Sequence, residues 1–109
     1  MGKLERTLQG NFNTVLKGIE QTLLESSHTA SLEEKSDFHS NGARCSVRQF
    51  EWFSPAGGNR ITMTVTLFQA EEGPIYLSAV TSGGSQAMFY KTSSWGGDNV
   101  LNILSDYLN

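Results

Sequence analysis

The stretch ITMTVTLFQA, residues 61–70, decides the fold, because its apolar and polar side chains alternate almost without interruption. Such alternation predicts an antiparallel strand that faces the core on one side and water on the other. Residues 75–79, IYLSA, repeat the pattern after the turn-like segment 71–74. Consecutive strands joined by a short turn usually pair with each other, so these residues predict the centre of an antiparallel sheet.

Two further strands are expected before this hairpin, on either side of Asn41-Gly42. Asn-Gly is the strongest two-residue hairpin signal, because both positions tolerate a positive φ. The first strand, residues 29–38, is polar enough to be an edge strand. In the second, the alternation predicts that Ala43, Cys45 and Val47 point inward. The residues expected on the polar outer face are Arg44, Ser46, Arg48, Thr62, Thr64 and Thr66.

Phe50 and Trp52 stand in the wrong phase for this assignment, since they share the parity of Arg48. One extra residue near Arg48-Gln49, a β-bulge, would return both aromatic rings to the core face, and we predict that bulge. Without it, both rings are expected outside beside Phe68 and Tyr76, in an apolar patch that suggests a dimer interface.

Two amphipathic helices are expected, one before and one after these strands. Apolar residues recur at helical spacing in the first, namely at Phe12, Val15, Leu16, Ile19, Leu23 and Leu24. Either Asn11 or Asn13 can cap its first turn. Gly18 weakens this helix by about 1 kcal/mol relative to alanine and suggests a close backbone contact. Asp98 can cap the second helix, whose apolar face comprises Val100, Leu101, Leu104, Tyr107 and Leu108.

Residues 3–9 fit a strand or a helical face, and we expect a strand, whereas residues 87–91 look like a last short strand. The predicted fold class is α+β. A curved antiparallel sheet of four to six strands is covered on one face by an N-terminal and a C-terminal helix, in a two-layer sandwich. Residues 1–109 are expected to form a single domain, since no repeat or linker interrupts them.

The chain has 109 residues, with 8 Lys+Arg against 11 Asp+Glu and a net charge of −3. This acidic balance argues against nucleic-acid binding. No apolar run approaches the ~18 residues of a membrane span, and the first residues are too polar for a signal peptide. One cysteine permits no internal disulfide, so we expect a cytoplasmic protein.

Few residues suggest catalytic or metal chemistry. Cys45 belongs to the predicted inward set, so we expect a buried structural thiol rather than a nucleophile. Glu33, Asp37 and His39 share one face of the edge strand, but three mixed ligands are a weak metal signal, and a solvated edge explains them. We therefore expect no metal and no other cofactor, and the sequence gives little support to enzyme activity.

The segment 81–86, TSGGSQ, is the most unusual stretch of the chain. Successive backbone N–H groups in a glycine-rich loop can hold an anion. The known phosphate motifs continue with Lys-Ser/Thr or with a third glycine that opens a helix, and neither follows here. A turn or bulge is therefore the first interpretation, and a ligand-contacting loop of Gly83, Gly84, Ser85 and Gln86 is the alternative.

Three segments of the chain resemble a family of small bacterial proteins of unknown function. They are residues 36–47 with SDF and NGxRCxV, residues 57–60 with GGNR, and residues 78–87 with SAxTSGGSQA. The resemblance covers nearly the whole chain and implies no activity. The order β-α-β4-α is also similar to helix-grip folds, some of which hold lipids or other apolar ligands between sheet and helix, although a fold does not fix a function.

Three functions remain open. The first is a non-catalytic interaction domain, homo-oligomeric, that uses the outer sheet face or an edge strand. Narrowly behind it is a carrier of a small apolar ligand, with a pocket between helix and sheet rimmed by Gly83-Gly84-Ser85. The last is an enzyme that uses Cys45 or the Glu33/Asp37/His39 cluster.

Overall fold

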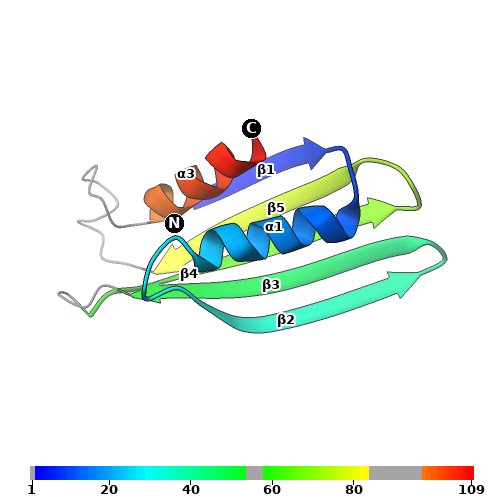
Figure 1. Ribbon diagram of the computed structural model, residues 1–109. Helices are drawn as coiled ribbons and strands as arrows, with labels where there is room; N and C mark the ends of the chain where they lie inside the picture. The colour runs from blue at the N-terminus through cyan, green and yellow to red at the C-terminus, as the bar shows by residue number, and fades with distance from the viewer. Residues whose placement is uncertain (1, 54–57, 84–96) are drawn as a thin grey trace.

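The computed structural model describes residues 2–53, 58–83 and 97–109. They form β1 (Gly2–Leu8), α1 (Phe12–Leu24), β2 (Ser31–Ser40), β3 (Ala43–Phe53), β4 (Arg60–Ala70), β5 (Ile75–Gly83) and α3 (Gly97–Leu108). The strands pair antiparallel in the order β1-β5-β4-β3-β2, and α1 and α3 cover one face of this open sheet (Figure 1). The predicted α+β fold, with an N-terminal and a C-terminal helix on one face, is confirmed.

The predicted turns and edges agree with the structure. Asn41 and Gly42 have φ values of 50° and 83°, so both adopt the left-handed conformation that joins β2 to β3. β1 pairs with β5 along its whole length, which confirms the N-terminal strand. The short strand expected at residues 87–91 lies outside the described residues.

The β-bulge predicted near Arg48-Gln49 is wrong. The register of β3 against β4 runs without a shift from Ala43 opposite Ala70 to Phe53 opposite Arg60. An irregularity does occur in this half of the sheet, but it lies in β2, between Leu32 and Glu34.

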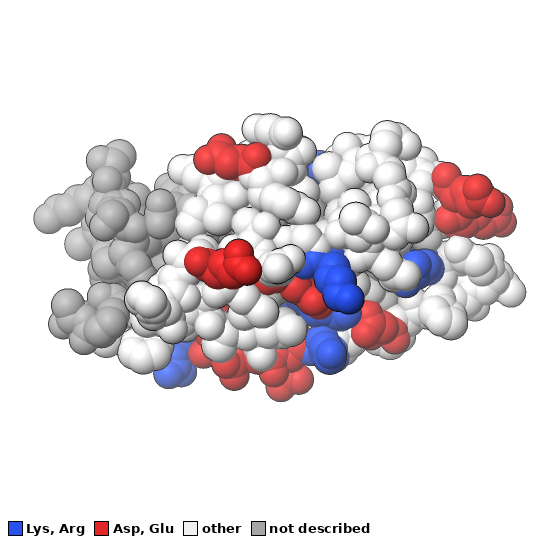
Figure 2. Space-filling view, in the orientation of Figure 1, with Lys and Arg blue, Asp and Glu red and all other residues white. Residues whose placement is uncertain are grey.

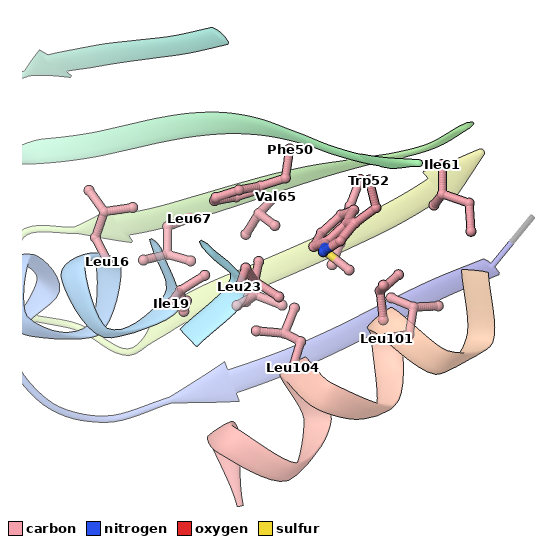
Figure 3. Packing of buried hydrophobic residues seen from close by; sticks show 14 of the residues in the cluster. Leu16, Ile19, Leu23, Phe50, Trp52, Ile61, Val65, Leu67, Leu101 and Leu104 are labelled. Carbon is pink, nitrogen blue, oxygen red and sulfur yellow. The ribbon is translucent and has the colours of Figure 1, made fainter. Parts of the chain in front are cut away.

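Phe50 and Trp52 nevertheless point into the core, because the first half of β3 has the opposite orientation to the predicted one (Figure 3). The side chains on the helix-covered face are Arg44, Ser46 and Arg48, and those on the outer face are Ala43, Cys45 and Val47. Full burial of a large side chain is worth about 1.5–3 kcal/mol. Two large aromatic rings therefore outweigh the three small side chains that the alternation had placed inside.

The core lies between the sheet and the two helices. Its fully buried members include Ile19 and Leu23 of α1, Phe50 and Trp52 of β3, and Leu104 of α3 (Figure 3). The one polar atom of the Trp52 ring is also satisfied, because its Nε1 donates a hydrogen bond to Ser26 Oγ at 2.9 Å. Side chains from every layer thus meet in one continuous apolar cluster.

α1 begins after Asn11, whose side-chain oxygen accepts a hydrogen bond from the Thr14 amide at 2.9 Å. Of the two candidate caps, Asn11 is therefore the one used. The predicted apolar face is confirmed at Phe12, Leu16, Ile19 and Leu23, which are buried. Leu24 was expected on this face but is exposed, since it ends the helix next to the C-cap Glu25.

Gly18 of α1 is a point of contact with α3. A Cβ atom built on Gly18 would overlap the hydroxyl group of Tyr107 in α3. Glycine therefore leaves the space that the tyrosine ring needs to lie across α1. The close contact that the sequence suggested at this position is confirmed.

We predict that the effect of Gly18→Ala depends on Tyr107. In the wild-type background, the helix-propensity gain of about 1 kcal/mol should be cancelled or reversed, because the tyrosine ring must move. In a Tyr107→Ala background the same change should stabilise the protein by about that amount. Urea denaturation of the four proteins of this double-mutant cycle measures the difference, and equal effects in both backgrounds would contradict the contact.

Candidate functional site

The outer face of the sheet carries a row of exposed aromatic rings. Phe38 of β2 lies opposite Cys45 of β3, Cys45 opposite Phe68 of β4, and Phe68 opposite Tyr76 of β5. The three rings are 62%, 39% and 51% exposed, respectively. We call Phe38, Phe68 and Tyr76 the aromatic ridge. No described residue covers it, because both described helices pack on the other face.

Small side chains fill the next row of the outer face. Ser36, Val47, Thr66 and Ser78 lie opposite one another across β2, β3, β4 and β5. We call Ser36, Thr66 and Ser78 the hydroxyl row. Because these side chains are short and the aromatic ones are long, the two rows form a step in the surface.

A shallow open hollow of about 580 Å³ lies along this step. Its lining on the outer face comes from Glu5 and Thr7 of β1, Thr66 and Phe68 of β4, and Tyr76 and Ser78 of β5. Two rings of the aromatic ridge, Phe68 and Tyr76, thus bound the hollow, and Thr66 and Ser78 of the hydroxyl row form its floor. Its shape suits an inserted apolar side chain better than a small molecule enclosed on all sides.

Charged groups on the outer face are largely paired within the face. Lys3 Nζ lies 3.9 Å from Glu5 Oε2 on β1, and Arg60 Nε lies 3.5 Å from Glu51 Oε1 across β4 and β3. These exposed pairs add little stability, but they leave the face nearly neutral. A face of this kind does not repel an approaching surface of either sign.

Cys45 lies within the aromatic row and not in the core, which corrects the predicted burial. Its thiol is free and half-buried, and its cross-strand neighbours are Phe38 and Phe68. The expectation failed because Cys45 was assigned to the core together with Ala43 and Val47. Its neighbours across the strands are aromatic, and neither is an acid or a base that could activate a thiol.

The helix-covered face holds a charged cluster beside the apolar core. Arg48, only 5% exposed, donates through Nε to Glu20 of α1 and pairs through Nη2 with Asp37 of β2 at 3.0 Å. Ser46 Oγ donates to the same Asp37 at 2.7 Å. Figure 2 shows this side of the molecule, where acidic and basic side chains lie close together near α1.

These contacts shift the pKa values of both charged partners. The hydrogen bond from Ser46 has the largest effect and lowers the pKa of Asp37. Burial raises this pKa by less, and the hydrogen bond and charge of Arg48 lower it further. Burial alone would lower the pKa of Arg48, but its hydrogen bonds to Glu20 and Asp37 outweigh burial and raise that pKa. Both shifts favour the charged forms of Asp37 and Arg48. Together with Glu20, these two residues close the β2 side of the core as an ion-pair network.

A second basic residue stabilises the start of α1. Arg44 Nη2 donates to Asn13 Oδ1 at 2.6 Å, and its guanidinium lies 4.3 Å from the centre of the Phe12 ring. A polar hollow of about 300 Å³ lies next to it, lined in part by Glu71 and Glu72. Since acidic and basic groups both line this hollow, its charge selects neither an anion nor a cation.

The metal-ligand cluster that the sequence analysis considered at Glu33, Asp37 and His39, and did not favour, does not form in the described part of the chain. Glu33 lies at the register shift of β2, while Asp37 is engaged by Ser46 and Arg48. No group of three His, Cys, Asp or Glu side chains among the described residues is close enough to hold a metal ion.

Of the predicted ligand-contacting loop, only Gly83 belongs to the described residues, whereas Gly84, Ser85 and Gln86 lie outside them. Gly83 ends β5 with a φ of 94°, and a Cβ atom there would overlap the carbonyl oxygen of Arg60. Close backbone packing therefore explains this glycine without a ligand.

The fold and this exposed face define a small two-layer α+β domain with one open sheet face. A family model described as a family of unknown function (DUF6054) matches residues 1–109, so the chain belongs to that family. The expected membership of an uncharacterised family is confirmed, and the family name carries no activity. No curated protein matches the sequence.

Three solved structures match this chain at low sequence identity, and the first of them has a similar fold. PA94, a protein of unknown function from Pseudomonas aeruginosa proposed to be a regulator, has a TM-score of 0.52 and 8% identity, covering 74% of this chain and 68% of its own. TTHA0849 from Thermus thermophilus has a TM-score of 0.30 and 13% identity, covering 97% and 94% of the two chains. The di-domain ARO/CYC StfQ of the steffimycin biosynthetic pathway has a TM-score of 0.39 and 11% identity, covering 99% of this chain and 43% of its own.

The helices give no sign of membrane insertion. Neither α1 nor α3, the two helices that the described residues form, is long and apolar enough to cross a membrane. Their apolar sides are instead used to cover the sheet.

We predict that Glu20→Gln destabilises the protein by about 1–3 kcal/mol, because buried Arg48 loses its charged partner on α1. The control is Glu25→Gln, the same change at an exposed position one turn further along, which should stay within about 0.5 kcal/mol of wild type. Urea denaturation at pH 7 compares the free energies of unfolding. Equal effects of the two changes would mean that the ion-pair network adds nothing to stability.

We also predict that Gly83→Ala lowers the free energy of unfolding by about 2 kcal/mol or more, since it adds a clash with the Arg60 carbonyl to the cost of a positive φ. Gly58→Ala is the matched control: Gly58 has a φ of 66°, but its Cβ atom would meet open space. Its cost should be about 1 kcal/mol. A Gly83→Ala variant as stable as the wild type would contradict the packing explanation and support the ligand-contacting interpretation of this loop.

Proposed function

We propose that this protein is a non-catalytic interaction domain, and that its docking surface is the open outer face of the sheet. The observation that carries the proposal is the aromatic ridge beside its hollow. Aromatic side chains that remain exposed next to a concave, nearly neutral surface are typical of protein–protein interfaces. The ridge contributes no packing to the core, so folding alone does not require it.

The alternative, a carrier of a small apolar ligand between helix and sheet, has less support. That space is occupied by Ile19, Leu23, Phe50 and Trp52, each of which is at most 1% exposed. A ligand of ordinary size needs about 300 Å³ or more, so these side chains would have to move to admit it. The outer face needs no such rearrangement.

Enzyme activity also has less support than interaction. Cys45 lies between two aromatic residues, and the described carboxylate Asp37 is engaged in an ion pair. We further place the interaction in the cytoplasm, because a reducing compartment keeps the single thiol free.

We predict that Cys45 is shielded when the protein is in its native surroundings. Cys45 is the only cysteine of the chain and lies on the proposed surface, so maleimide labelling of its thiol reports on that face. The rate should be several-fold lower in a gel-filtered extract of the native cells than in dilute purified protein, because the partner covers the face.

The control is the double variant Cys45→Ser/Gln21→Cys, which moves the thiol to the exposed side of α1. Its labelling rate should be the same in extract and in buffer. Equal rates for wild-type Cys45 in the extract and in purified protein diluted until it is monomeric would overturn the proposed function.

A further inference from the structure

The outer face holds two rows that are complementary to each other in shape. The aromatic ridge stands out from the sheet, and the hydroxyl row beside it forms the floor of the hollow. A surface that contains both a ridge and the groove that fits it can pair with a copy of itself, because each copy supplies what the other needs. This self-complementarity favours a second copy of the chain, rather than an unrelated protein, as the partner.

The geometry of such a pair follows from the sheet. Successive rows on one face are about 6.7 Å apart along the strands, and stacked sheets lie about 10 Å apart. In this pair, the two-fold axis lies midway between the two stacked sheets. It runs across the strands, between the aromatic ridge and the hydroxyl row, so that each strand lies above the same strand of the other copy. Phe68 of one copy then faces Thr66 of the other, and Tyr76 faces Ser78.

Charge and area both agree with a second copy. Because Lys3 pairs with Glu5 and Arg60 with Glu51 inside each face, two identical faces meet with little repulsion. A face of five strands, which are 7 to 11 residues long, measures roughly 750 Å² before side chains are counted. A standard interface buries about 800 Å² on each partner, so the size is that of a stable dimer.

The edges of the sheet are less suited to self-association. β2, one of the two edge strands, carries Glu33, Glu34, Lys35 and Asp37 together with the register shift, and β1, at the other edge, carries the Lys3–Glu5 pair. Charged side chains and bulges are the usual means of preventing edge-to-edge pairing.

On the basis of the proposed function, we infer that the occupant of the outer face is a second copy of this chain, docked with each aromatic ridge over the other copy's hydroxyl row. The dimer is a face-to-face stack of two sheets, with α1 and α3 on the outside of each. Its centre is the contact between the Phe68 ring and the hollow.

Complementary variants test this arrangement directly. Thr66→Phe fills the groove, so that the introduced ring meets the second copy's Phe68, and Phe68→Thr removes the ridge at its centre. Each change alone should raise the dimer dissociation constant by about tenfold or more in sedimentation equilibrium of the full chain. An equimolar mixture of the two variants should associate again. In the mixed dimer, each phenylalanine at position 66 or 68 faces a threonine of the other copy.

The matched control is Leu24→Thr, which removes an exposed apolar side chain from the helix side and should leave the dissociation constant unchanged. Circular dichroism of both interface variants should match the wild type, since Phe68 and Thr66 lie outside the core. Because dimerisation itself stabilises the folded state, their urea denaturation is compared with that of wild-type protein diluted until it is monomeric, and it should be the same. This separates lost association from lost folding.

Three results would overturn the inference: a wild-type protein that stays monomeric, a dimer that neither variant weakens, or a mixture that does not associate again. The labelling experiment distinguishes these from failure of the proposed function. If Cys45 is shielded in the extract but not by raising the concentration of purified protein, the face still binds a partner, and that partner is a different protein.

Discussion

The burial of Phe50 and Trp52 beneath the helices is the constraint on which the rest of the structure depends, since side chains alternate strictly along a strand. Once these rings point inward, Arg48 and Ser46 must also face the helices, and Cys45 must face out. The apolar core and the exposed face are therefore two consequences of one choice of orientation. No bulge interrupts β3 to separate them.

The same orientation of β3 places the charged side chain of Arg48 beneath α1. Burying a guanidinium group is costly unless its hydrogen bonds and charge are satisfied, and here Glu20 and Asp37 satisfy them from both sides. Arg48 thereby links α1 to the edge strand β2 at the point where the apolar core ends. The lowered pKa of Asp37 shows that this carboxylate is stabilised in its charged form, so its contribution holds above its unfolded pKa of about 3.8 and is lost as the pH falls below it.

Local patterns predicted most of the fold. Alternation in residues 61–70, the Asn41-Gly42 turn, and helical spacing in the two terminal segments each depend on neighbouring residues, and each was confirmed. The orientation of β3 was predicted wrongly because both alternating sets of its side chains contain apolar residues. Deciding between the two orientations requires knowing that Glu20, 28 residues earlier, supplies a partner for Arg48.

The candidate site was harder to predict, since its rows are built across strands and not along the sequence. Phe38, Cys45, Phe68 and Tyr76 are spread over nearly forty residues and meet only through the register. The sequence did indicate that Phe68 and Tyr76 lie outside, and it linked an exposed aromatic patch to a dimer. It added Phe50 and Trp52 to that patch only for a strand without a bulge, whereas the structure has no bulge in β3, buries both rings and forms the patch with Phe38.

The distribution of polar groups favours the open face, and not an edge, as the proposed binding surface. Both edge strands carry charges, and β2 adds its register shift, so their free backbone groups are poor templates for another strand. The helices cover the opposite face and use its apolar side chains for folding. Among the surfaces that residues 2–53, 58–83 and 97–109 form, the outer face combines exposed rings, a hollow and paired charges. A protein that only needed to be soluble would gain by replacing those rings with threonines like their neighbours at Thr62, Thr64 and Thr66, and their presence is therefore best explained by binding.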